Sequence, residues 1–71
     1  MLVYVVQDDI NGDGNTTLES VSLTEEKAQE GFKKVAAAYG LSLKTATRYI
    51  SIEIWDAETG DYVCDLKPIT E

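Results

Sequence analysis

The chain has no histidine, a single cysteine and a single proline among its 71 residues. Without histidine it lacks the imidazole that most zinc sites and serine-type catalytic sites require. The lone cysteine, Cys64, excludes an internal disulfide and a zinc site built from cysteines. No histidine is present to activate its thiol as a nucleophile, so we expect Cys64 to be a small core residue.

Long apolar runs are also missing, and no stretch approaches the length needed to cross a bilayer. The first residues read as a strand, not as a signal peptide with a basic start and a small-residue cleavage site. We therefore expect a soluble, cytoplasmic protein. The length predicts one domain spanning residues 1–71.

Basic residues are scarce, since 6 lysines and arginines stand against 13 acids and give a net charge of −7. This charge opposes direct binding to nucleic acid, which needs a basic surface. Residues 1–30 and 53–71 hold all the acids, whereas residues 31–52 contain bases and no acid. Two interpretations remain: a surface that keeps the protein soluble, or an acidic docking surface for a basic partner.

A helix is predicted over residues 24–39. Thr24 can cap its first turn, and Gly40 can supply the left-handed residue that ends it. Apolar side chains recur at helical spacing and define one face that must pack on a sheet: Ala28, Phe32, Val35, Ala36 and Tyr39. Gly31 adjoins this face and predicts a close approach to the sheet.

Four segments with strand character surround the helix, at residues 2–7, 17–22, 48–55 and 62–67. The first is apolar on both faces, which indicates a central strand, and the second has little apolar content, which indicates an edge. Residues 41–47 are expected to be a linker or a short irregular segment. The sequence therefore predicts an α+β fold of ββαββ order, with an antiparallel sheet of three to four strands and one helix on one face.

In the third strand Ile50, Ile52 and Ile54 should meet the helix, while Tyr49, Ser51, Glu53 and Trp55 should point to the other face. In the fourth strand alternation places Tyr62, Cys64 and Leu66 together and leaves Val63 and Asp65 on the opposite side. An uncovered face with aromatic residues predicts an interaction surface or a dimer interface. Stacking of Trp55 and Tyr49 on nucleic-acid bases is the alternative, which the surrounding acids disfavour.

Acidic side chains cluster around the second hairpin, and we expect them to be solvated and not catalytic, because a general acid needs burial to tune its pKa. They are Glu53, Asp56, Glu58, Asp61 and Asp65. With no activated nucleophile, no phosphate-binding loop and little room for a buried pocket, we expect a protein that is not an enzyme and carries no cofactor.

The loop after the first strand spells D-x-N-x-D-G-N and resembles the first half of the calcium-binding loops of EF-hands and dockerins. The resemblance implies a metal site at Asp9, Asn11, Asp13 and Asn15. Two features depart from that pattern. Ser20 stands where a bidentate Glu is required, and a strand precedes the loop where an EF-hand has a helix. The alternative is a hairpin loop shaped by its Asn-Gly and Asp-Gly pairs.

Small size, negative charge and the ββαββ layout are together similar to small bacteriophage inhibitors, including some anti-CRISPR proteins. The resemblance implies a non-enzymatic protein that occupies the nucleic-acid-binding groove of a basic partner, and it assigns no residues. From the residues themselves we expect partner contacts at Tyr49, Glu53, Trp55, Glu58, Asp61 and Asp65. The alternatives are a calcium-binding module, through the loop from Asp9 to Asn15, and a homodimeric structural domain.

Overall fold

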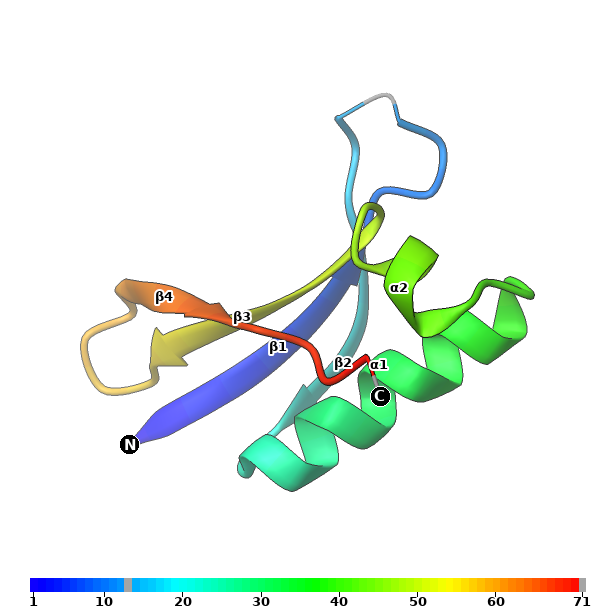
Figure 1. Ribbon diagram of the computed structural model, residues 1–71. Coiled ribbons are helices and arrows are strands. Elements are labelled where there is room, and N and C mark those ends of the chain that lie inside the picture. The colour runs from blue at the N-terminus through cyan, green and yellow to red at the C-terminus, as the bar shows by residue number, and fades with distance from the viewer. Residues whose placement is uncertain (13, 71) are drawn as a thin grey trace.

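Four strands form one antiparallel sheet in the computed structural model, which describes residues 1–12 and 14–70. The strands are β1 (Leu2–Asp8), β2 (Thr17–Ser22), β3 (Ile50–Asp56) and β4 (Tyr62–Leu66). Their order across the sheet is β2-β1-β3-β4, so two hairpins are joined through a central pair, β1 and β3 (Figure 1). The predicted α+β class, the central place of the first strand and the edge place of the second are confirmed.

The main helix, α1 (Glu25–Ala38), starts and ends where the sequence predicts. At its start the backbone N–H of Lys27 donates to the Thr24 hydroxyl at 3.2 Å. At its end the N–H groups of Gly40 and Leu41 donate to the carbonyls of Ala37 and Ala36, the paired bonds of a Schellman motif. Gly40 has a φ of 70°, which a residue with a Cβ rarely adopts.

A short second helix, α2 (Leu43–Ala46), replaces the predicted linker. Ser42 caps this single turn, because its hydroxyl accepts the Thr45 N–H at 3.2 Å. Ala46 is buried in the core beneath α1, which explains why the turn is fixed. Neither helix is long and apolar enough to span a membrane, in a search that covered the described residues.

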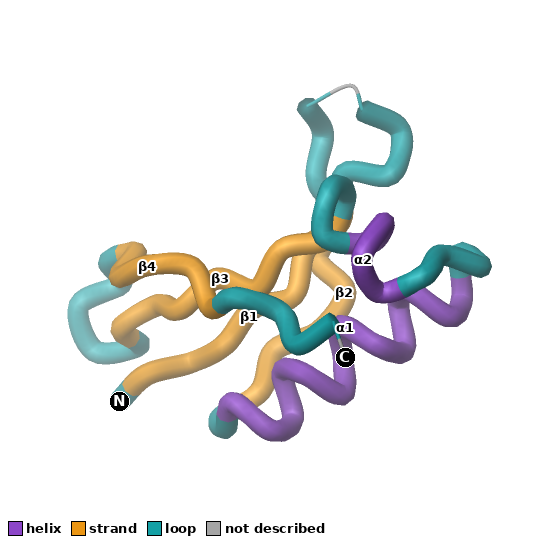
Figure 2. The backbone as a smooth tube through the Cα atoms, in the orientation of Figure 1, coloured by secondary structure: helices purple, strands orange, loops and turns teal. Residues whose placement is uncertain are grey.

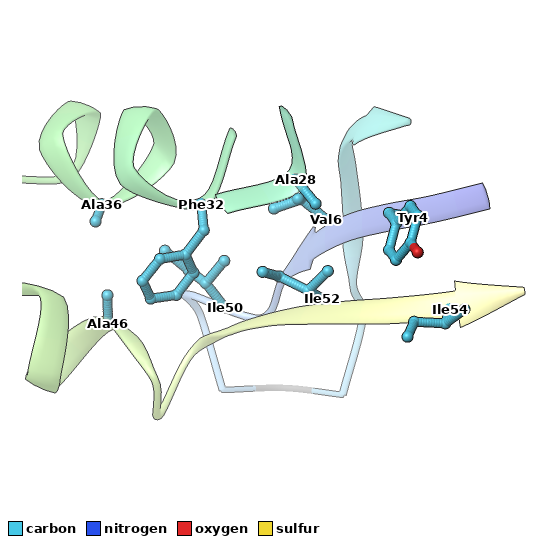
Figure 3. Packing of buried hydrophobic residues seen from close by; sticks show 9 residues of the cluster. All are labelled: Tyr4, Val6, Ala28, Phe32, Ala36, Ala46, Ile50, Ile52 and Ile54. Carbon is cyan, nitrogen blue, oxygen red and sulfur yellow. The ribbon is translucent and has the colours of Figure 1, made fainter. Parts of the chain in front are cut away.

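The core lies between α1 and one face of the sheet (Figure 3). The three isoleucines of β3 belong to the core on the α1 side of the sheet, as the sequence predicts, and Phe32 is fully buried among them. The buried apolar residues are Tyr4, Val6, Ala28, Phe32, Ala36, Ala46, Ile50, Ile52 and Ile54. Tyr39, expected on the buried stripe, is 43% exposed, and its hydroxyl reaches Oδ2 of the buried Asp8 at 3.5 Å.

The fourth strand corrects two predictions. Cys64 is exposed and is not a core residue. It pairs with Ile54 and so lies on the helix side of β4, but α1 packs over β2, β1 and β3 and leaves β4 exposed up to Leu66, which packs against the core. A register shift between Ile54 and Trp55 pairs Trp55 with Tyr62. Tyr62 therefore lies on the face opposite α1, not with Cys64 and Leu66.

After β4 the chain returns to α1 (Figure 2). The side-chain amide of Gln29 holds this segment by two hydrogen bonds to its backbone. Its Nε2 donates to the Lys67 carbonyl at 3.1 Å, and the Ile69 N–H donates to its Oε1 at 3.0 Å. These contacts fix residues 67–69 against the first half of α1.

Gly31 lies where α1 is in close contact with β2. A Cβ built on it would lie 2.8 Å from Ser20 Oγ and 3.5 Å from Val6 Cγ2. Ser20 Oγ is itself buried and has no hydrogen-bond partner in the part of the chain that the structure describes. The close approach expected at this glycine is confirmed.

We expect Gly31→Ala to stabilise the protein by ~1 kcal/mol in a Ser20→Ala background, because alanine favours the helix over glycine by about that amount. In the parent the same change should lose this gain, since the new methyl group meets Ser20 Oγ. Urea unfolding of the four proteins of this double-mutant cycle measures the coupling. An equal effect of Gly31→Ala in both backgrounds would contradict the contact.

Candidate protein-interaction surface

The face of the sheet opposite α1 is left open in the part of the chain that the structure describes. Strand pairing places ten residues on it, and we call this set the open face: Val3, Val5, Gln7, Leu18, Val21, Ser51, Glu53, Trp55, Tyr62 and Asp65. Both helices contribute their buried residues to the core on the other side (Figure 1). Among the described residues no helix packs on the open face.

The open face has two chemically different halves. Over β1 and β2 it is largely apolar, with Val21 and Leu18 exposed by 56% and 60%. Over β3 and β4 it combines two aromatic rings with two carboxylates, and we call these four residues the acid–aromatic cluster: Glu53, Trp55, Tyr62 and Asp65. An apolar region beside polar, charged groups is typical of protein-binding surfaces.

All the basic residues lie outside the strands of the sheet. The four strands contain five acids and no lysine or arginine. The six bases lie on the helices or in the connections: Lys27, Lys33, Lys34, Lys44, Arg48 and Lys67. The sheet layer therefore carries negative charge without a neutralising base of its own.

Hydrogen bonds hold the side chains of the acid–aromatic cluster in place. Oε1 of Glu53 accepts from Gln7 Nε2 at 2.9 Å and from Trp55 Nε1 at 3.2 Å. The Tyr62 hydroxyl donates to Asp65 Oδ1 at 2.7 Å. The rings of Trp55 and Tyr62 meet edge to face, with centroids 5.7 Å apart at 74°. The cluster is thus ordered without a partner.

The two carboxylates of the cluster oppose each other directly, because Glu53 and Asp65 are paired across β3 and β4. Like charges at directly opposed positions destabilise an antiparallel pair. Neither carboxylate forms an ion pair within the described part of the chain. The arrangement leaves a local concentration of negative charge that a cation would relieve.

Tyr62 stays protonated over the ordinary pH range. Its hydrogen bond to the Asp65 carboxylate raises the pKa of Tyr62 to about 12, and the negative charges of Asp65 and Glu53 act in the same direction. The Tyr62 hydroxyl therefore remains a donor, and Asp65 Oδ1 remains occupied by it.

The turn from β3 to β4 presents two further acids at one end of this surface. Asp56 shapes the turn, since its Oδ1 accepts the N–H groups of Glu58 and Thr59 at 2.8 and 3.4 Å. Glu58 and Asp61 are exposed. The Met1 amino group lies 3.3 Å from Glu58, but both groups are largely exposed, so this ion pair contributes little to stability.

Tyr49 does not join the acid–aromatic cluster. It precedes β3, where its carbonyl accepts the Asp9 N–H at 2.7 Å, and its side chain is 37% exposed. Trp55 lies six residues further along an extended segment, which separates the two by roughly 20 Å. Tyr49 and Trp55 therefore cannot stack on neighbouring bases of one nucleic-acid strand.

The loop proposed for calcium extends past the end of the sheet (Figure 2). Asp13 lies outside the described residues, and Asn11 is exposed. Asp9 Oδ1 is buried and accepts no hydrogen bond from any described residue. In the described part of the chain no group of three or more Asp, Glu, Cys or His side chains is placed to hold a metal. Gly12, with a φ of 67°, fits a hairpin turn.

We expect millimolar calcium to leave the melting temperature of the parent unchanged, because a hairpin loop gains nothing from the ion. The double variant Asp9→Ala with Asp13→Ala should fold, and calcium should leave its melting temperature unchanged as well. As a control of equal charge, Glu58→Ala with Asp61→Ala removes two acids elsewhere. A rise of several degrees with calcium that only the loop variant abolishes would establish a calcium site instead.

Two residues that donate hydrogen bonds to the carboxylates of the acid–aromatic cluster are missing from the predicted partner contacts. Gln7 is absent because its role depends on the pairing of β1 with β3, and Tyr62 because the register shift changes its face.

No family model matches this chain, and searches of curated proteins and of solved structures found no match. The assignment of function therefore rests on the surface itself.

Proposed function

We propose that the protein is a non-enzymatic acidic binding module that attaches to a basic protein through its open face. One observation carries this proposal: the open face has opposed carboxylates, aromatic rings and apolar side chains, while its strands contain no base. Neither a metal nor another cofactor is needed for this function.

The charge distribution supports a basic partner. The negative sheet layer would steer a positively charged surface toward the open face and raise the rate of encounter. The exposed Leu18 and Val21 side chains of β2, beside the half-buried valines of β1, would then bury apolar area, which holds the complex together.

The basic partner that we favour is a protein that itself binds nucleic acid. We place this interaction in the cytoplasm. Carboxylates fixed on a rigid sheet can replace the phosphates that such a protein contacts, so the module would act as an inhibitor that mimics nucleic acid. This is the function implied by the resemblance to phage inhibitors such as anti-CRISPR proteins.

Association of two copies through their open faces is disfavoured by the same charges. A symmetric contact would bring Glu53 and Asp65 of one copy near those of the other, with no base in the strands to separate them. We therefore expect the partner to be a different protein and not a second copy of this chain.

Affinity capture with the tagged protein, followed by binding measurements on the purified partner, tests the proposal. The expected partner is basic, loses affinity as salt increases, and is displaced from the module by a nucleic acid that it binds itself. If the affinity of the captured protein for the module depended neither on salt nor on competing nucleic acid, the proposal that the module mimics nucleic acid would be refuted.

A further inference from the structure

We infer that the acid–aromatic cluster receives an arginine side chain of the partner, held between the carboxylates of Glu53 and Asp65 and against the rings of Trp55 and Tyr62. This inference rests on the proposed function and specifies the chemistry of the contact. It follows from the way the four side chains share their hydrogen bonds.

Each carboxylate uses one oxygen and leaves the other available. Glu53 Oε1 accepts from Gln7 and Trp55, and Asp65 Oδ1 accepts from Tyr62. Glu53 Oε2 and Asp65 Oδ2 accept no hydrogen bond from the described residues. Since Glu53 and Asp65 are direct neighbours across two strands, both carboxylates project from the same part of the open face.

The neighbouring rings favour a flat cation. Trp55 is partly exposed and Tyr62 is 49% exposed, so both can contact a group that approaches the carboxylates. A guanidinium stacks on aromatic rings and directs several N–H donors at once, whereas an ammonium is compact and strongly hydrated. Two acceptors beside two rings therefore suit arginine better than lysine.

The cluster is also prepared for binding. The bonds from Gln7 and Trp55 fix the Glu53 side chain, and the bond from Tyr62 fixes Asp65 before any partner arrives. Fewer side-chain conformations are then lost on association. Because a like-charged pair is already present in the free protein, a bound cation would also remove its repulsion.

A pair of peptides tests the inference. One is rich in lysine, and the other is the same peptide with its central lysine replaced by arginine, so their charges are equal. Calorimetric titration at low salt should show tighter binding of the arginine peptide to the parent by about tenfold. Trp55 is the single tryptophan, so its fluorescence should also change with that peptide.

Variants locate the contact. Trp55→Leu, and separately Glu53→Gln with Asp65→Asn, should reduce the preference for arginine to about onefold. Glu58→Gln with Asp61→Asn removes equal charge at the exposed turn and should keep the preference. Circular dichroism confirms that each variant is folded.

The results separate the inference from the proposed function. Equal affinity for the two peptides, or an arginine preference that survives both cluster variants, overturns the inference but leaves salt-dependent binding to an acidic surface intact. Failure of both peptides to bind at low salt would overturn the proposed function together with the inference.

Discussion

We expect Phe32→Ala to unfold a large part of the protein at room temperature. Phe32 is fully buried, and Figure 3 shows its ring directed from α1 toward Ile50 and Ala46. Truncating a buried phenylalanine costs ~3 to 5 kcal/mol, because transfer energy is lost and a cavity remains. A domain of this size has a total stability of roughly 4 to 10 kcal/mol.

Thermal and urea unfolding followed by circular dichroism measure this loss. Phe32→Leu keeps most of the buried volume and should cost much less. Leu23→Ala removes a large apolar side chain that is 65% exposed and should have little effect. If Phe32→Ala melted within a few degrees of the parent, Phe32 would not be central to the core.

The second large effect is expected for binding. Changing Glu53, Glu58, Asp61 and Asp65 to lysine takes the net charge from −7 to +1 and reverses the sign of the surface around the β3–β4 hairpin. Association with the basic partner should slow by about 100-fold or more at low salt, since steering becomes repulsion. Surface plasmon resonance measures the association and dissociation rates separately.

A matched control reverses Glu19, Glu25, Glu26 and Glu30, which are exposed on β2 and α1, and has the same net charge. It should bind faster than the hairpin variant, because the open-face acids are intact. In the parent, raising salt from about 50 to about 500 mM should reproduce the slowing, as the Debye length falls below ~10 Å. Equal rates for both variants would show that position on the surface does not matter.

Local signals explain the parts of the fold that the sequence predicts correctly. Thr24 and Gly40 determine the ends of α1 through bonds to residues within one turn. The alternation of Ile50, Ile52 and Ile54 determines the buried face of β3 in the same way. The chain order ββαββ follows from these segments alone.

Exposure of Cys64 could not be predicted, because it depends on the relative widths of two layers. One helix is about 10 Å wide, whereas four strands spaced by about 4.8 Å are wider. Some strand must remain uncovered, and only the tertiary arrangement makes it β4. The fold of α2 likewise depends on the burial of Ala46 under α1.

The candidate surface was partly predictable. Alternation along β3 places Glu53 and Trp55 together on the open face, and Asp65 joins them through strand pairing. Tyr49 precedes the other end of β3, away from this group. Tyr62 joins the group because of the register shift between β3 and β4, which the alternation of residues in the sequence does not indicate.

The central pairing of β1 with β3 has a consequence for how quickly the protein folds. Asp8 pairs with Ile50, 42 residues further along the chain, and β2 and both helices lie within this long loop. Each hairpin can form locally, but the core closes only when the two halves of the chain meet. Docking of the halves is therefore expected to limit the folding rate, and residues in the middle of β1 and β3, such as Val6 and Ile52, should influence that rate most.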